Sequence, residues 1–464
     1  MDEKKYDTPL TEGCVWKQIT RFFFPIFLGA FFQQLYNMTD AVILGQFAGT
    51  DAFGAVSALG NLFRLPLNFF GGLAAGASVV LSQLYGAKNG PGLRRAVGAT
   101  AFLTLVCGAA FSALGVAFSP ACLRAINMPA ALYPHALVYT RIYFGGLFFS
   151  LIYNMGAGAL RAVGDSRRPF YFLIVSCCLN IGLDLVFVAL LHMGAAGAAL
   201  ATVLSQAVSA LLVVRALLRT DGDYRLLPSM ISGKSAFLKD ILKTGVPIGV
   251  QGILWPIANL MIQSAVNLHG ADAVAAWGVS GKLDFIIWIV LDEMGITAST
   301  FTAQNFGAQK YSRAREGVRV CILLSLLMVI PMSLTLYFFS DPLGFLFVDN
   351  AAVVALSAQL MRTYLAPYYL AYIGGEVLCG AIRGTGETFR PMLLTLLCIC
   401  AFRIVWTLVA QRAAGTLDAV VLCYPWSWFL NSGAFLLYYF TSRSPTVHLL
   451  RRGAEQTVPA LQRD

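Results

Sequence analysis

Long apolar runs separated by short polar loops make up most of the chain. Each run is long enough to cross the roughly 30 Å hydrocarbon core of a bilayer as a helix that rises about 1.5 Å per residue. The pattern therefore predicts an all-α membrane protein with twelve transmembrane helices. The expected spans are residues 19–45, 54–82, 97–118, 136–159, 170–191, 196–218, 245–268, 274–303, 318–340, 354–381, 391–410 and 419–440.

The first run differs from the others because its second half is polar. Gln33, Gln34, Asn37 and Asp40 lie within residues 19–45. A carboxylate near the bilayer centre costs roughly 2.5 to 3.5 kcal/mol even on the mildest scale. Positions 33, 37 and 40 have the i, i+4, i+7 spacing that places side chains on one helix face. We interpret this stripe as facing a water-filled or protein-lined cavity.

Composition and charge are typical of a membrane protein. Hydrophobic residues make up 58% of the chain and charged residues 12%, whereas about 25% of residues are charged in a soluble domain. The net charge of +10 comes from Lys and Arg in the loops on one side, so both termini are expected in the cytoplasm and no nucleic-acid partner is expected. The ten cysteines lack ligand spacing, which favours packing over disulfides or zinc.

The chain repeats itself at an offset of 221 to 222 residues. Residues 83–88 (QLYGAK) match 304–309 (QNFGAQ), residues 160–165 (LRAVGD) match 382–387 (IRGTGE), and Pro25 falls on Pro247. The repeats carry basic loops on the same side, so each half crosses the membrane an even number of times, as in parallel six-helix repeats. The expected organisation is an N-terminal lobe (1–219), a cytoplasmic linker (220–243) and a C-terminal lobe (244–464).

The sequence resembles the MATE family of multidrug and toxic compound extrusion transporters over essentially its whole length. The resemblance depends on residues 33–40 (QQLYNMTD), 180–184 (NIGLD), 194–202 (GAAGAALAT) and the two repeated motifs together. It implies twelve helices in two lobes that open alternately to either side. It also implies export of amphipathic, cationic small molecules in exchange for H⁺ or Na⁺.

Two acids of the first half are expected to meet in one polar pocket. Asn180 and Asp184 are four residues apart and share a helix face, and Asp184 and Asp40 lie at similar depths beyond the midplane. Other polar residues expected near this pocket are Gln34, Asn37, Asn154 and Thr202. The second-half positions that match Asp40, Asn180 and Asp184 are Ile262, Phe402 and Trp406.

This pocket suits a small cation. Two close carboxylates repel each other when both are ionised, which favours a bound proton; the same oxygens, with those of Asn and Thr, also suit Na⁺ at Asp40, Asn180 and Asp184. The residues do not decide between the two ions. In one subgroup of the family that the chain resembles, the coupling-ion site lies at these three positions. The alternative is that Asp40 and Asp184 only form hydrogen bonds to neighbouring helices.

The second half carries its own acids within apolar spans. Asp292 and Glu293 lie on the eighth span, and Glu376 on the tenth falls on Asn154 of the first half. We expect these acids to line the substrate cavity or to form internal ion pairs with Arg403 or Lys282, and the sequence leaves both open.

The predicted function is secondary active efflux by a monomer in a bacterial inner membrane, with membrane lipid and a small-molecule substrate as partners. A flippase for lipid-linked sugars with a related fold is the nearest alternative. An enzyme is not expected, because the four histidines are scattered and no phosphate-binding Gly-rich loop occurs. No cofactor is expected apart from the coupling ion.

Overall fold

The computed structural model describes residues 9–453, except for the side chain of Asn61, and within them every regular element is helical. The elements of the first half are α1 (Val15–Phe47), α2 (Gly49–Gly86), α3 (Gly90–Ala125), α4 (Tyr133–Ala162), α5 (Arg167–Asp184), the π-helix η2 (Leu185–Leu190), α6 (Gly194–Arg219) and the 3-10 helix η3 (Pro228–Met230). The elements of the second half are α7 (Ala236–Asn267), α8 (Ala271–Leu283), α9 (Phe285–Gly307), α10 (Tyr311–Gly344), α11 (Ala351–Leu360), η4 (Met361–Leu365), η5 (Ala366–Tyr368), α12 (Tyr369–Gly384), α13 (Phe389–Thr395), η6 (Leu396–Ala401), α14 (Phe402–Ala413), α15 (Leu417–Val421), α16 (Cys423–Thr441) and α17 (Pro445–Arg452).

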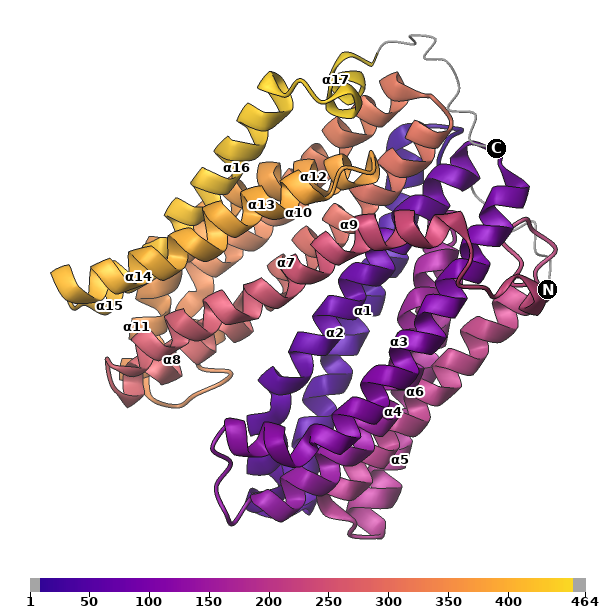
Figure 1. The fold of residues 1–464 in the computed structure, drawn as a ribbon. Helices are drawn as coiled ribbons and strands as arrows, with labels where there is room; N and C mark the ends of the chain where they lie inside the picture. Colours follow the sequence, from indigo (N-terminus) through magenta and orange to yellow (C-terminus); the bar gives the residue numbers. More distant parts are fainter. Residues whose placement is uncertain (1–8, 454–464) are drawn as a thin grey trace. The chain divides into compact units, whose positions relative to one another are not determined.

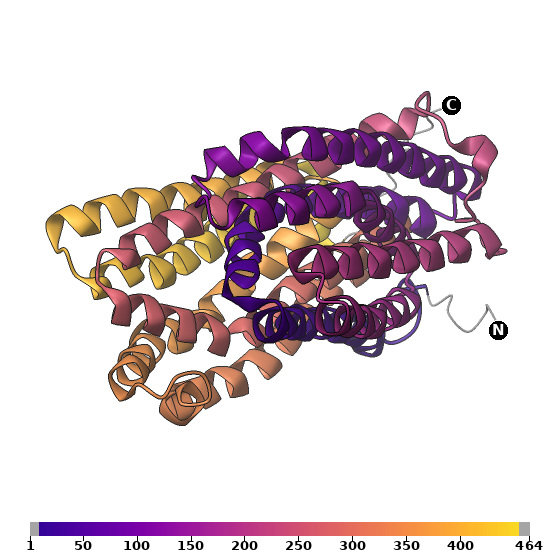
Figure 2. The same cartoon turned by 90° about the horizontal axis from the view of Figure 1, so that it is seen from below.

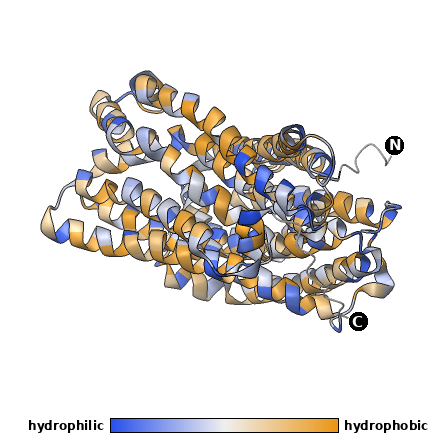
Figure 3. Cartoon of the chain, turned by 90° about the horizontal axis from the view of Figure 1, so that it is seen from above, coloured by the Kyte–Doolittle hydropathy of each residue, from blue (hydrophilic) through white to orange (hydrophobic). Residues whose placement is uncertain are grey.

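All twelve predicted spans fall on helical segments, so the predicted all-α class is confirmed. Among the described residues, 11 helical segments are long and apolar enough to cross a membrane. α1 has 33 residues but is not one of these 11 segments, because its polar second half lowers its hydropathy. Figure 3 shows hydrophobic residues along most of the helices and hydrophilic ones mainly in the connections between them.

Three predicted spans are broken in the structure, one of them 419–440, which passes from α15 to α16 at Leu422. The span 274–303 consists of α8 and α9, which are separated at Asp284. The span 354–381 passes through a π-turn and a 3-10 turn before α12 begins at Tyr369. Pro367 lies in that 3-10 turn, and its ring removes the backbone donor that a continuous α-helix needs.

One compact unit comprises Phe22–Leu81 and Gly90–Leu260. In it α4 packs against α3 and α6, and Figures 1 and 2 show these helices side by side. Glycines allow the close approach: a Cβ added at Gly146 would lie 2.1 Å from Val203 Cγ2. The close packing of helix backbones through small residues is typical of membrane proteins.

A second compact unit comprises Pro9–Arg21, Ser82–Asn89 and the described part of the chain from Met261 onward. In it α12 packs against α9 and α16, and a Cβ at Gly380 would lie 2.2 Å from Gly295 O. These contact-based units have different bounds from the lobes 1–219 and 244–464 that the sequence repeat predicts. The lobe bounds and the linker 220–243 therefore stay a prediction.

The repeated motifs adopt equivalent conformations. A Cβ at Gly86 would lie 1.9 Å from Gln304 O, and a Cβ at Gly307 would lie 1.9 Å from Gln83 O. The two motifs therefore pack against each other reciprocally inside the second unit, and a side chain at either glycine would collide with backbone. The motifs also end alike, because the residues at positions 88 and 309 both have positive φ, at 53° and 57°.

The second repeated motif shows the same equivalence. Gly164 and Gly386 both have a φ of 91°, and the acid that follows each glycine pairs with an arginine three residues later: Asp165 with Arg168 and Glu387 with Arg390. Such matching backbone and side-chain geometry is what duplication of a six-helix unit produces.

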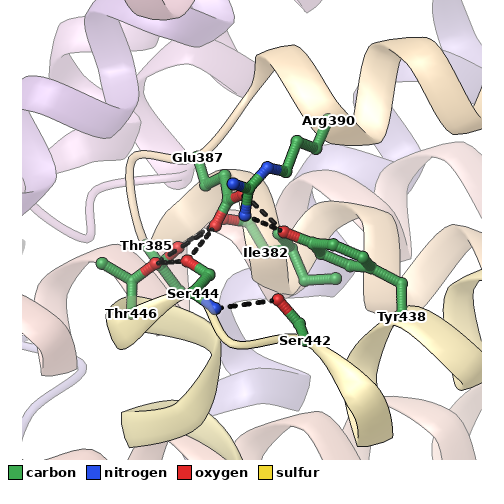
Figure 4. Close-up of polar contacts among 8 residues, drawn as sticks. All are labelled: Ile382, Thr385, Glu387, Arg390, Tyr438, Ser442, Ser444 and Thr446. Atoms are coloured by element: carbon green, nitrogen blue, oxygen red, sulfur yellow. Dashed lines mark hydrogen bonds and ion pairs between the residues drawn. The ribbon is translucent and has the colours of Figure 1, made fainter.

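The acids of this motif also hold the segment that follows the sixth helix of each half. Figure 4 shows Glu387 accepting hydrogen bonds from Tyr438 and Ser444, the latter at 2.6 Å. In the first half, Asp165 binds Arg168, which donates to the Tyr224 hydroxyl at 2.8 Å.

Candidate functional site

The structure brings Asp40 and Asp184 together. Asp40 lies on α1, and Asp184 is the last residue of α5 before the π-helix η2. The Asp184 side chain is fully buried and that of Asp40 is half-buried, and the two carboxyl groups lie close enough to interact directly. The irregular turn that follows Asp184 is typical of functional positions in helices.

Asn180 and Thr202 complete this polar cluster. With the Asn180 amide oriented to satisfy both neighbours, its nitrogen donates to Asp184 Oδ2 at 2.8 Å and its oxygen accepts from the Thr202 backbone N–H at 3.2 Å. One turn of α5 places the two side chains on the same face, and α6 supplies Thr202. Asn180 therefore fixes one oxygen of Asp184 and leaves the other available.

Three buried oxygens of the cluster have no hydrogen-bond partner among the described residues: Asp40 Oδ1, Asp184 Oδ1 and Thr202 Oγ1. Leaving a buried polar atom unpaired costs about 1 to 3 kcal/mol. Oxygen atoms are the ligands that hard cations prefer, so this set suits a proton or Na⁺. Within residues 9–453 no group of three or more His, Cys, Asp or Glu is arranged to hold a metal ion.

Tyrosines lie around the acids, although no pattern in the sequence predicted them there. Tyr36 lies close to both acids and to Thr202. Tyr139 and Tyr143 come from α4, lie near Asp40, and stack with ring centroids 5.9 Å apart. The only sequence signal was the i, i+4 spacing of Tyr36 with Asp40 and of the two α4 tyrosines with each other, and this spacing is equally typical of core packing.

The remaining first-half candidates are placed differently. Asn154 donates to Ser150 O of its own helix at 2.8 Å. Gln34 is half-buried and Asn37 is exposed. The polar stripe of α1 is therefore only partly buried, and Thr202 is the additional candidate that the structure brings to the acids.

A second acidic cluster lies in the second unit. Asp292 on α9 lies close to its neighbour Glu293 and to Glu376 on α12, and Arg383 is a cation close to Asp292 and Glu376. The Tyr372 hydroxyl donates to Glu376 Oε2 at 2.8 Å. A Cβ at Gly295 would lie 2.6 Å from Glu376 Oε1, so the absence of a side chain there makes room for this carboxylate.

Arg383 is a cation beside the second-half acids that the sequence reasoning did not name, and ion pairing of these acids with Arg403 or Lys282 stays a prediction. Arg403 is fully buried, stacks 4.1 Å from the Tyr424 ring centroid and donates to Ser427 Oγ at 2.9 Å. Lys282 lies over the Phe347 ring. Arg383 follows Glu376 by seven residues, two helical turns, so the spacing on α12 contained the signal for this partner.

Comparison with known proteins gives consistent matches. The MatE family model matches residues 25–186 and 247–409. The probable multidrug resistance protein YoeA of Bacillus subtilis is 29% identical over 396 residues, which cover 83% of this chain and 84% of the relative. The probable multidrug resistance protein YpnP of the same organism is 28% identical over 437 residues, which cover 94% and 97%.

The fold is also found in solved structures. An outward-facing multidrug resistance MATE family transporter of the MOP superfamily superimposes with a TM-score of 0.87 at 21% identity, and the match covers 92% of this chain and 96% of that one. At this identity the likeness shows a shared fold.

Proposed function

Because the chain belongs to the MATE family of membrane transporters, we propose that it exports amphipathic, cationic small molecules by antiport with H⁺ or Na⁺. The relatives named as multidrug resistance proteins support this class of substrate. The observation that carries the proposal is the close approach of the Asp40 and Asp184 carboxyl groups beside the Thr202 hydroxyl, a set of oxygens that suits a cation.

The mechanism follows from the cost of holding this pair. Two unit charges about 4 Å apart repel by about 4 kcal/mol at an effective dielectric constant near 20. A cation that enters from outside and binds between the two carboxylates removes this repulsion. It therefore stabilises the conformation in which it can reach the pair. A bound ion shifts a conformational equilibrium only by its difference in affinity between the two states. Binding of the ion on one side of the membrane and its release on the other therefore shift the equilibrium between the outward-open and inward-open forms in turn.

Asp40, Asp184, Asn180 and Thr202 are the proposed ion-coupling residues. Tyr36, Tyr139 and Tyr143 limit the water around them. A site with few polar groups besides the ion ligands strengthens the interaction of the carboxylates with the ion.

The second unit supplies the proposed substrate contacts. Asp292, Glu293 and Glu376 carry more negative charge than Arg383 balances, which favours a cationic ligand. Trp288 contacts the Tyr372 ring at 5.4 Å between centroids, and aromatic faces bind organic cations. Gln34, Asn37 and Asn154 are proposed cavity residues of the first unit.

The chain is proposed to act as a monomer in a bacterial plasma membrane, with both termini in the cytoplasm, as the basic loops indicate.

Everted membrane vesicles test the proposal. Ethidium added to vesicles that contain the protein is expected to dissipate a pre-formed pH or Na⁺ gradient. Asp40→Asn should insert normally and abolish this response, whereas Asp51→Asn, at an exposed acid in the first turn of α2, should retain it. A wild-type protein that dissipates neither gradient, but moves lipid-linked sugars across the bilayer, would instead be a flippase.

A further inference from the structure

A short segment before α1 is bound tightly in the second unit. We name residues 10–13 the N-terminal strap. The strap has no regular secondary structure, so its backbone carbonyls need donors from elsewhere. Leu10 and Thr11 are nevertheless buried, with exposed fractions of 1% and 7%.

Four residues at the end of α9 and the start of α10 supply the partners: Gln304, Asn305, Lys310 and Arg313, here called the cradle. Gln304 Oε1 accepts from the Leu10 N–H at 2.9 Å. Lys310 Nζ donates to Thr11 O at 3.0 Å, and the Asn305 amide donates to Leu10 O at 3.4 Å.

Arg313 makes the largest number of these contacts. Its guanidinium donates to the carbonyls of Leu10 at 3.1 and 3.2 Å, of Glu12 at 2.8 Å and of Gly13 at 2.6 Å. It also lies 5.5 Å from the ring centroid of Phe301, which helps to hold its planar group in one orientation. A planar group with five fixed donors suits several carbonyls at once in a way that a lysine does not.

The cradle belongs to one copy of the repeat. At the offset of 221 residues, Gln304 matches Gln83, but Asn305 and Arg313 match Leu84 and Gly92. The first-half copy therefore lacks the side chains that bind the strap. Conversely, the acids Asp40 and Asp184 occur in the first half alone. Duplication gave a common scaffold, and the strap cradle is an addition to the second copy.

α1 connects these two specialised features. The start of α1, residues 15–21, belongs to the second unit together with the strap. The same helix from Phe22 onward belongs to the first unit. Val15 and Ile19 are buried, with exposed fractions of 4% and 0%. The helix that carries Asp40 thus begins at an anchor on α9 and α10.

We propose that the cradle holds the strap throughout the transport cycle and so couples the ion site on α1 to the second unit. Gln304, Asn305, Lys310 and Arg313 are positioning residues, because they act through α1 and contact neither ion nor substrate. This inference rests on the proposed antiport function.

The first test compares two arginines of α10. Arg313→Gln removes the contacts to the strap, and Arg315→Gln removes contacts to the backbone of Arg451 and Arg452 near the end of α17. In proteoliposomes we expect Arg313→Gln to lower ethidium transport at least about fivefold and to raise the number of ions moved per ethidium. A merely structural role would lower both fluxes in proportion. Arg313→Lys should recover part of the coupling, and Arg315→Gln should resemble the wild type.

A covalent rescue makes the test independent of folding. Thr11→Cys and Gln309→Cys, the latter at an exposed residue next to the cradle, are joined in a Cys14→Ser background by a short bis-maleimide linker. The linker is expected to leave transport intact in the otherwise native protein and to restore coupling to Arg313→Gln. Full coupling in unlinked Arg313→Gln would overturn the proposal, and so would a linked protein that no longer transports, since the strap would then have to detach.

Failure of the antiport function gives a different result. If the native protein moves neither H⁺ nor Na⁺ with ethidium, the proposed function fails and the coupling role fails with it. Hydrogen exchange then still reports on the cradle itself: protection of the Leu10 amide that is lost in Arg313→Gln identifies the cradle as an anchor without a coupling role, and an unprotected Leu10 amide in the native protein overturns the anchor too.

Discussion

The acids of the two units have different neighbours. Asp40 and Asp184 lie among tyrosines, an amide and a threonine, all uncharged. Asp292 and Glu376 lie beside a cation of their own unit, Arg383, and a tyrosine that donates to Glu376. The same duplicated scaffold therefore holds one acidic pair without internal charge balance and one cluster with partial balance.

We propose that this difference reflects a division of labour between the proposed ion site and the proposed substrate site. A carboxylate pair without an internal cation has to take its positive charge from outside, which is the requirement for a coupling ion. We propose that the second cluster, in which Arg383 lies beside the acids, binds a large organic cation and then releases it. The comparison leads to four predictions, from the largest expected effect to the smallest.

Neutralising the first pair should have the largest effect. Asp40→Asn and Asp184→Asn are each expected to lower ion-driven ethidium efflux about 100-fold, because a factor of ten corresponds to about 1.4 kcal/mol and a lost charge interaction exceeds this. The double variant should be no slower than either single variant, since the two carboxyls act as one site. Initial rates in proteoliposomes measure this, with equal insertion as the control. Multiplicative losses would mean two independent sites and would break the comparison.

Neutralising the second cluster should affect substrate and spare the ion. Glu376→Gln is expected to raise the KM for a monovalent organic cation about tenfold, equivalent to about 1.4 kcal/mol of binding, without changing the ion dependence at saturating substrate. Glu316→Gln, at an exposed acid on α10, serves as the matched control. If Glu376→Gln no longer moved ions at saturating substrate, the ion site would have to be assigned to the second unit.

Removing a hydroxyl from one of the tyrosines near Asp40 and Asp184 should show whether these tyrosines contribute to ion binding. Tyr36→Phe and Tyr143→Phe are each expected to weaken ion affinity about three- to tenfold, because each removes a hydroxyl dipole near Asp40 and a polar interaction of this kind contributes about 0.5 to 1.5 kcal/mol. The ion concentration at half-maximal transport measures the shift. Tyr171→Phe, at a tyrosine of α5 with 51% exposure, should have no effect. Unchanged affinity in both shell variants would limit the tyrosines to packing.

The equivalent acids of the repeated turn should have the smallest effect on transport, and equal effects in both halves. Asp165→Asn and Glu387→Gln each remove a charge-assisted anchor, so each should lower the melting temperature by a few degrees, corresponding to about 1 to 3 kcal/mol. Transport per folded molecule should stay within about twofold, given that neither acid belongs to the ion or substrate cluster. Asp223→Asn breaks an exposed ion pair with Arg94 and should cost about 1 kcal/mol or less. If only one of these two variants lost most of its transport activity, the two repeated turns would also differ in function.

Most of the fold could be predicted from the sequence, whereas the sites could be predicted only in part. Apolar runs predicted the helical spans, and the offset of 221 to 222 residues predicted the duplication, whereas the reciprocal packing of Gly86 and Gly307 came from the structure. The breaks at Asp284 and before Tyr369 were missed, because one residue hardly changes the mean hydropathy of a long window.

The sequence by itself determined the helical spans and the duplicated plan. It also identified the acids within apolar spans, whose transfer into hydrocarbon costs free energy. These follow from chain-local physics: the transfer of side chains into hydrocarbon and the obligation of every backbone group to be paired there. Only the tertiary structure decided that Tyr139 and Tyr143 lie near Asp40, that Arg383 lies near Asp292, and that Arg313 anchors the segment before α1. Those contacts join residues from different helices, and their proximity depends on how helices pack, which no local pattern specifies.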